Sequence, residues 1–139
     1  MYPYTTLVGA PELGYDQERP IYKRKPKSVP SSEFRALRAS NCDGLVRRLA
    51  ALRGADPPLD LTSHAVTRAL VDEASPIDDR LYKHREDLID AALCAWTGLL
   101  WLNHGLTRCQ VLGIGDTATP VATIIAPARP KQRRGSPAD

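Results

Sequence analysis

The sequence contains few cysteines and lacks a long apolar run. Its three cysteines form no Cys-x-x-Cys pair, which argues against a disulfide scaffold and against a standard zinc site. The longest uncharged apolar stretch, residues 91–102, is much shorter than the about 20 residues that a membrane-spanning helix needs. The first residues also lack a basic head followed by an apolar segment. We therefore expect no membrane partner and a cytoplasmic location.

An internal repeat and a Gly-rich phosphate-binding loop are also missing. A chain of 139 residues, 42% hydrophobic and 25% charged, is typical of one globular domain. Twelve prolines indicate extensive loops, and the last residues are mostly basic, small or proline. We predict one domain over residues 1–127, followed by a disordered basic tail over residues 128–139.

Charge is distributed unevenly along the chain. Residues 19–53 contain ten basic and two acidic side chains, whereas residues 56–90 contain nine acidic and four basic ones. A basic segment beside an acidic one fits a polyanion held over a cation-binding site. The alternative is an ordinary solvated helix face and loop, which composition alone favours.

Apolar residues recur at helical spacing in three segments. The first runs from about residue 31 to residue 52, either continuously or broken at residues 41–44. A short helix ending before Pro76 follows it. The third segment, about residues 80–103, is apolar on most of its circumference, which is typical of a buried helix.

The remaining segments predict a small sheet. Residues 109–114 and 119–125 have the composition of strands and are separated by a turn, so we predict a C-terminal hairpin. Residues 2–15 indicate an irregular lead-in, within which residues 5–8 are a candidate strand. The expected fold class is therefore α/β, with mainly helices and a C-terminal β-hairpin.

Two carboxylates on the long helix are the strongest chemical signal. Asp87 and Asp90 are three residues apart, so a helix places both on one face, where they could share a divalent cation. The alternative is that acidic residues near the start of the helix interact with its dipole. Asp90 lies beyond the first turn of the predicted helix, which weakens that explanation for it.

Several motifs resemble the C-terminal end of one known family. They are the helix motif Lys-His-Arg-Glu-Asp-Leu-Ile-Asp-Ala-Ala-Leu-Cys-Ala-Trp-Thr at residues 83–97, the strand ending at Asp116 and the closing Ile-Ile-Ala-Pro at residues 124–127. The family is the domain-of-unknown-function 429 family (DUF429), whose members are predicted nucleases with an RNase H-like fold. The Tyr2-Pro3 opening and residues 21–24 also resemble family features.

The resemblance implies a partial RNase H-like fold and metal-dependent phosphodiester hydrolysis. Asp87 and Asp90 would then be catalytic metal ligands, and the cation would be Mg²⁺ or Mn²⁺. Lys23 and Arg24 would hold a phosphate of the substrate, which would be a nucleic acid.

The family pattern also differs from this sequence at one end. Family members carry a first strand with an early Asp and a further acidic residue ahead of the Tyr-Pro element, and both would lie before Met1. We therefore expect a C-terminal portion of the family's domain, with an incomplete active site. The apolar helix over residues 88–102 would then lack part of its cover and could mediate self-association. The alternative function is a non-catalytic module that binds nucleic acid or a partner through the basic segment 19–53.

Overall fold

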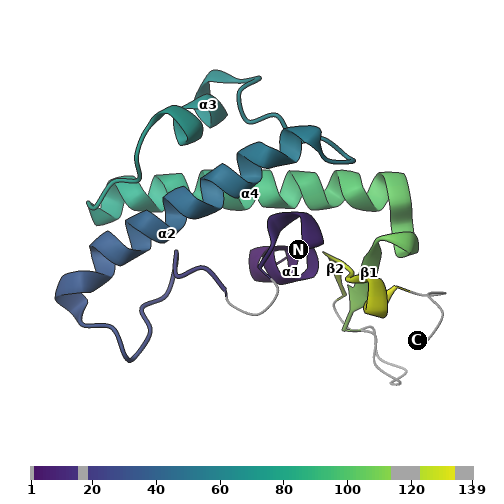
Figure 1. Ribbon diagram of the computed structural model, residues 1–139, viewed down its shortest axis with the longest axis horizontal. Coiled ribbons are helices and arrows are strands. Elements are labelled where there is room, and N and C mark those ends of the chain that lie inside the picture. The colour runs from purple at the N-terminus through teal and green to yellow at the C-terminus, as the bar shows by residue number, and fades with distance from the viewer. Residues whose placement is uncertain (1, 16–18, 114–122, 134–139) are drawn as a thin grey trace. The chain divides into compact units, whose positions relative to one another are not determined.

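The computed structural model describes residues 2–15, 19–113 and 123–133. The chain divides into two compact units, one formed by residues 1–18 and 93–139 and the other by residues 19–92. Helix α4, Asp79–His104, contributes its first half to the second of these units and its remainder to the first. Figure 1 shows these elements coloured along the chain.

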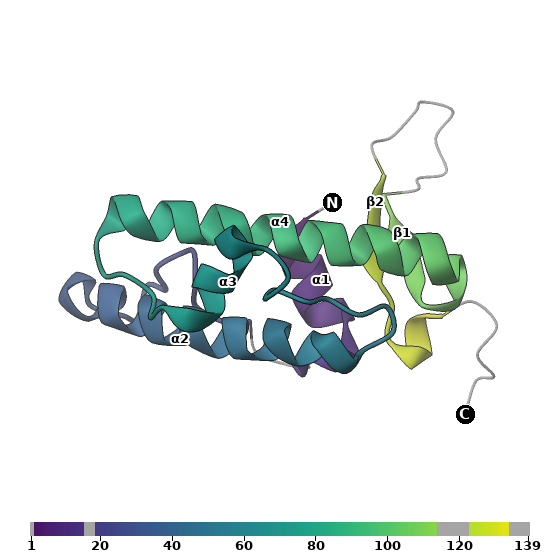
Figure 2. The ribbon, with the colours of Figure 1, turned by 90° about the horizontal axis from the view of Figure 1, so that it is seen from above.

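The unit of residues 19–92 contains only helices and loops. Helix α2 spans Ser31–Ala51, a 3-10 turn follows at Leu52–Gly54, and helix α3 spans Ala65–Asp72. Figure 2 shows α2 and α3 beside the first half of α4. The three predicted helices are thus confirmed. Of the two alternatives for the first helix, the continuous one is found, because Cys42, Leu45 and Leu49 are fully buried on α2 and their packing outweighs the low helix propensity of one glycine.

The opening of the chain forms a helix, so the irregular lead-in and the candidate strand at residues 5–8 are wrong. Helix α1 spans Pro3–Gly9. Pro3 stands in its first turn, where the fixed φ of proline suits a helix and a missing N–H costs nothing. Leu7 is fully buried, and the hydroxyl of Thr6 shares a buried hydrogen bond of 2.9 Å with Thr97. These contacts outweigh the strand propensity of the β-branched residues.

The predicted hairpin is confirmed as an antiparallel pair. Strand β1, Cys109–Leu112, pairs with strand β2, Ile124–Pro127, and Cys109 lies opposite Pro127. Helix α1 packs on β2, as Figure 1 shows. Of the other residues predicted as strand, residues 113 and 123 lie outside these two strands. The remaining ones, with the predicted turn and Asp116, belong to residues 114–122, which lie outside the described residues.

The predicted disordered tail is ordered at its start. Ala128 is fully buried, and the Arg129 guanidinium donates hydrogen bonds of 2.8 and 2.7 Å to the carbonyl oxygen of Val8. A 3-10 turn follows at Pro130–Gln132. These contacts attach residues 128–132 to the unit that contains α1. Residues 134–139 lie outside the described part of the chain.

The architecture is therefore mixed α/β, mostly helical with a two-stranded antiparallel sheet. Helix α4 is buried along one side, at Ile89, Leu93, Trp96 and Leu100, while Leu102 is 78% exposed. Leu81 and Leu99 are exposed as well, so α4 is buried on one side and not around most of its circumference, and self-association through residues 88–102 stays a prediction. Within the described residues, no helix combines the length and the apolar character needed to cross a membrane.

Substitution of Gly9 tests the contact between α1 and β2. A Cβ atom on Gly9 would overlap the main-chain oxygen of Pro127, and backbone atoms move only at a high cost. We expect Gly9→Ala to lower the free energy of unfolding by about 1–3 kcal/mol. Gly98→Ala is the matched control, because Gly98 lies on α4 with open space around it and should stabilise the helix by about 0.5–1 kcal/mol. Urea unfolding measures both changes in the free energy of unfolding. A stabilising effect of Gly9→Ala, as expected for Gly98→Ala, contradicts the close approach of Gly9 to Pro127.

Candidate functional site

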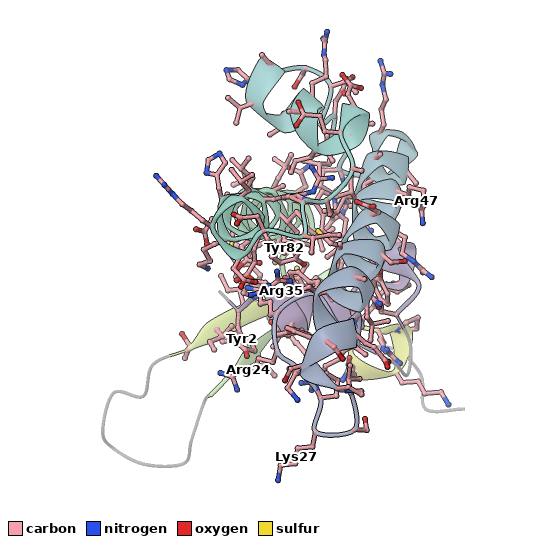
Figure 3. All side chains as sticks on the ribbon, turned by 90° about the vertical axis from the view of Figure 1, so that its left-hand side faces the viewer. Tyr2, Arg24, Lys27, Arg35, Arg47 and Tyr82 are labelled. Atoms are coloured by element: carbon pink, nitrogen blue, oxygen red, sulfur yellow. The ribbon has the colours of Figure 1, made fainter. Side chains whose placement is uncertain are left out.

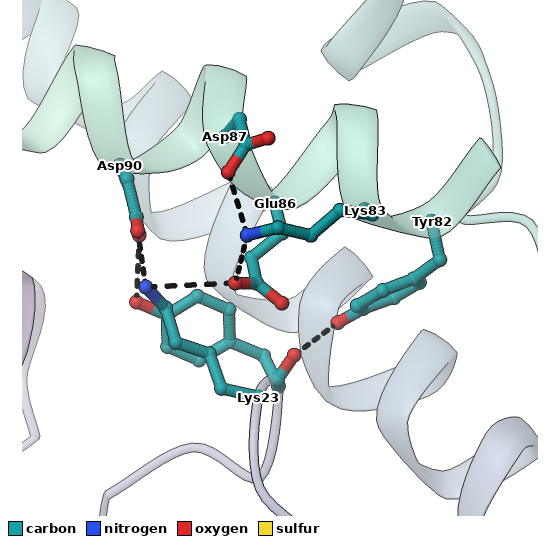
Figure 4. A network of polar contacts seen from close by, with 7 residues as sticks. Lys23, Tyr82, Lys83, Glu86, Asp87 and Asp90 are labelled. Atoms are coloured by element: carbon teal, nitrogen blue, oxygen red, sulfur yellow. Dashed lines mark hydrogen bonds and ion pairs between the residues drawn. The ribbon is translucent and has the colours of Figure 1, made fainter. Parts of the chain in front are cut away.

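The candidate site lies entirely in the unit of residues 19–92. It is formed by one face of the first half of α4 and by the loop of residues 20–30, which precedes α2. Figure 4 shows the side chains that meet there. We call the five charged residues of this group the α4 cluster: Lys23, Lys83, Glu86, Asp87 and Asp90.

Asp90 points toward the loop and is held by two partners. Its Oδ1 accepts a hydrogen bond of 3.1 Å from the hydroxyl of Tyr22, and its Oδ2 accepts one from the ammonium group of Lys23. The Asp90 side chain is only 24% exposed. These two hydrogen bonds compensate for the hydration that a partly buried carboxylate loses.

Glu86 is the second carboxylate that faces the loop. Its Oε1 lies 3.8 Å from the Nζ of Lys23, and its side chain is 14% exposed. Glu86 and Asp90 are four residues apart, which leaves their side chains only ~40° apart around a helix of 3.6 residues per turn. These two carboxylates therefore converge on one cation, the ammonium group of Lys23, as Figure 4 shows.

Asp87 points elsewhere. Its side chain is 59% exposed, and its Oδ1 accepts a hydrogen bond of 2.7 Å from Lys83, whose ammonium also donates to Glu86 at 3.0 Å. Hydrogen bonds to Asp87 and Glu86 raise the pKa of the Lys83 ammonium above its ordinary value, so this group stays cationic. The structure thus does not direct Asp87 and Asp90 to one point, although both lie on the predicted helix.

Two tyrosines fix the loop against α4. Tyr22 is fully buried, and its main-chain oxygen accepts a hydrogen bond of 2.6 Å from the hydroxyl of Tyr82 on α4. Burial raises the pKa of Tyr82, so its hydroxyl is neutral and remains a donor. The guanidinium of Arg38 on α2 lies 3.8 Å from the centre of the Tyr82 ring. Lys23 therefore directly follows a residue that is fixed by burial and by a hydrogen bond to α4.

The acidic segment neutralises part of the basic one within this unit. Arg35 and Arg38 both donate to Asp79, at 2.6 and 2.8 Å. Arg53 lies 3.5 Å from Asp60. Together with Lys23, these arginines are four of the ten basic side chains of residues 19–53. The uneven charge therefore reflects internal ion pairing only in part.

Arg24 differs from these paired residues. It is exposed on the loop, and within the described residues it has no ion-pair partner. Figure 3 labels it together with Lys27, which lies at the tip of the loop and points away from the helices. Of the two predicted phosphate-binding residues, Lys23 is thus engaged with carboxylates and Arg24 is available to a ligand.

The α4 cluster fits a divalent cation in part. Carboxylate oxygens are the ligands that Mg²⁺ prefers, and Glu86 and Asp90 already converge on a positive group. No third His, Cys, Asp or Glu joins them as a ligand set in residues 2–15, 19–113 and 123–133. A complete site needs further oxygen ligands from water, from the substrate or from other residues.

Glu86 and Tyr22 were not predicted as site residues. The i, i+4 spacing of Glu86 and Asp90 is the signal that could have indicated Glu86. This spacing leaves the two side chains ~40° apart around the helix, whereas the i, i+3 spacing of Asp87 and Asp90 leaves them ~60° apart. Tyr22 contacts Asp90 across 68 residues of sequence, and no local pattern indicates such a contact.

Comparisons with known proteins do not identify this chain. No family model matches it, and neither a curated protein nor a solved structure does.

Proposed function

We propose that this chain is a metal-dependent nuclease of RNase H-like type. The observation that supports the proposal best is the convergence of Glu86 and Asp90, two partly buried carboxylates on one helix, on the ammonium group of Lys23. Partly buried carboxylates that face a common point can serve as oxygen ligands of a divalent cation, which metal-dependent hydrolysis uses. The motif of residues 83–97 resembles the last carboxylate helix of that class.

The residues of the α4 cluster take distinct roles in this proposal. Asp90 and Glu86 would hold a Mg²⁺ or Mn²⁺ ion through their carboxylate oxygens. When bound, the cation would supply activation of the attacking water and stabilisation of the leaving oxygen. Tyr22 orients Asp90 through its hydroxyl, and Lys23 balances the carboxylate charge and can turn to a phosphate oxygen. Asp87, paired with Lys83, contributes negative charge from the exposed side of the helix.

Two-metal chemistry needs more carboxylates than this cluster provides. The proposal therefore requires at least one additional carboxylate ligand that lies outside the α4 cluster. The RNase H-like fold is part of the same proposal, and the helix α4 with the β1–β2 hairpin would be its last elements.

A second candidate is a non-catalytic module that binds nucleic acid or a partner through the basic segment 19–53. The exposure of Arg24 and Lys27 favours it, because these side chains need no metal to contact a phosphate. The first candidate requires that a divalent cation, Mg²⁺ or Mn²⁺, binds to the chain, whereas the second requires none.

Thermal melting in a Mn²⁺ titration tests the proposed metal site. We expect Mn²⁺ to stabilise the chain by about 2.7 kcal/mol at roughly 100 times its dissociation constant, because the ion binds only the folded state. Asp90→Asn should abolish this stabilisation. Asp72→Asn, which removes an exposed carboxylate on α3, should leave it unchanged. Melting at constant ionic strength that shows no stabilisation by Mn²⁺ contradicts the metal site and favours the second candidate.

A further inference from the structure

The loop of residues 20–30 is rigidly anchored at its start. Tyr22 is fully buried, and Tyr82 holds its main-chain oxygen. The main-chain N–H of Ile21 donates a hydrogen bond of 3.2 Å to the side-chain oxygen of Asn41 on α2. The loop therefore leaves the helices at a fixed point.

The end of the loop is also ordered. The N–H of Val29 donates to the main-chain oxygen of Pro26 at 3.2 Å, and the ammonium of Lys25 donates to the main-chain oxygen of Val29 at 2.9 Å. Pro20, Pro26 and Pro30 reduce the conformational freedom of the loop further. A preformed loop loses little entropy when it binds a ligand.

Three cationic side chains lie between these anchors, and we call them the basic tip: Arg24, Lys25 and Lys27. All three are exposed. The partner given for Lys25 is a neutral carbonyl oxygen, so its charge is not balanced by that contact. No carboxylate of the described residues pairs with Arg24 or Lys27. The basic tip therefore differs from Arg35, Arg38 and Arg53, whose charges are paired with the acidic segment.

We infer that the basic tip is a binding surface for the phosphate backbone of a nucleic acid. Arg24 and Lys27 are three residues apart on this loop and both are exposed, so two cationic side chains can contact different phosphates of one strand. The loop presents no large exposed apolar side chain that could insert into a lipid surface. The sugar-phosphate backbone of a nucleic acid is thus the ligand that this surface fits.

The inference rests on the proposed function in one respect, namely that a nuclease substrate must also pass the α4 cluster. Lys23, which contacts Asp90, directly precedes Arg24 in the loop. A strand held by the basic tip therefore lies next to the carboxylates. Lys23 itself is paired with those carboxylates, so the basic tip makes the first contacts without it.

Fluorescence anisotropy with labelled single-stranded DNA, single-stranded RNA and duplex DNA tests this surface in the presence of EDTA. We expect the Arg24→Gln/Lys27→Gln variant to bind about ten-fold more weakly at low salt. The plot of log K against log salt concentration should become less steep, by about 1.4 for single strands or about 1.8 for duplex DNA, because two phosphate contacts are lost. The Arg35→Gln/Arg53→Gln variant changes the net charge equally at paired positions and should bind nearly as the unmodified chain does.

Three results overturn the inference: absence of binding at low salt, equal losses in both double variants, or binding to anionic phospholipid vesicles without binding to nucleic acid. The binding experiment and the cleavage experiment can give different answers, so the basic tip and the proposed nuclease are tested separately. Binding through the basic tip without any metal-dependent cleavage supports the surface and contradicts the nuclease. Cleavage that is unaffected by Arg24→Gln/Lys27→Gln supports the nuclease and contradicts the surface.

Discussion

Asp90→Asn is expected to reduce Mg²⁺-dependent or Mn²⁺-dependent phosphodiester cleavage by about 100-fold or more. Amide groups are weaker ligands for these ions than carboxylates, and even residues that only support a metal ligand contribute about 10–100-fold. A 100-fold loss corresponds to about 2.7 kcal/mol of transition-state stabilisation. The substitution preserves the size of the side chain, and its amide oxygen can still accept the hydrogen bond from Tyr22.

Asp87→Asn is the matched control for this prediction. It makes the same chemical change one helical turn earlier, but at a side chain that is exposed and paired with Lys83. We expect a loss of less than about ten-fold, since an exposed pair contributes little to its surroundings. Gel-based cleavage of labelled DNA and RNA, with each metal ion and with EDTA, measures both variants. Equal losses in the two variants would contradict the distinction between the inward and the outward carboxylate.

The sequence predicted the helices of this site correctly and the direction of its carboxylates only in part. Apolar spacing sets the helix over Asp79–His104, because the burial of Ile89 and Trp96 requires that face to be covered. The i, i+3 spacing of Asp87 and Asp90 leaves their side chains ~60° apart, enough for one to face the loop and the other to face solvent. Which of them faces inward depends on where the loop lies.

The position of the loop could not be predicted because its contacts join residues that are far apart in the sequence. Tyr22 and Lys23 contact Asp90 across 68 and 67 residues, and Tyr82 contacts Tyr22 across 60. Local composition describes the loop as basic and proline-containing, but it does not specify which helix face the loop covers. The same holds for α1, where burial of Leu7 and the Thr6–Thr97 pair outweighs local strand propensity.

Arg85 shows a further role that charge counting did not indicate. It is 7% exposed on α4, and its Nε donates to the hydroxyl of Ser75 at 2.8 Å. One terminal nitrogen donates to the main-chain oxygens of Leu70 and Glu73, at 2.7 and 2.8 Å. These oxygens lie at the C-terminal end of α3, where helix carbonyls lack partners within the helix. Arg85 therefore connects α3 to α4.

Arg85→Met is expected to lower the free energy of unfolding by about 3–5 kcal/mol. Methionine fills part of the volume, but it leaves several buried oxygen acceptors unsatisfied, and each such group costs about 1–3 kcal/mol. It also removes the positive partner that lies 3.6 Å from Asp43. Arg80→Met is the control, because Arg80 is exposed on the same helix and its loss should change stability by less than about 0.5 kcal/mol.

Urea unfolding followed by far-ultraviolet circular dichroism measures both variants, and hydrogen exchange of the amides of α3 locates the effect. We expect the amides of residues 68–72 to exchange faster in Arg85→Met, because α3 has only eight residues and depends on tertiary contacts for its stability. Because the Arg85 guanidinium binds the C-terminal end of α3, its loss should raise the exchange rates of these amides together. Unchanged exchange in α3 together with a large loss of global stability would instead assign the role of Arg85 to packing of α4 alone.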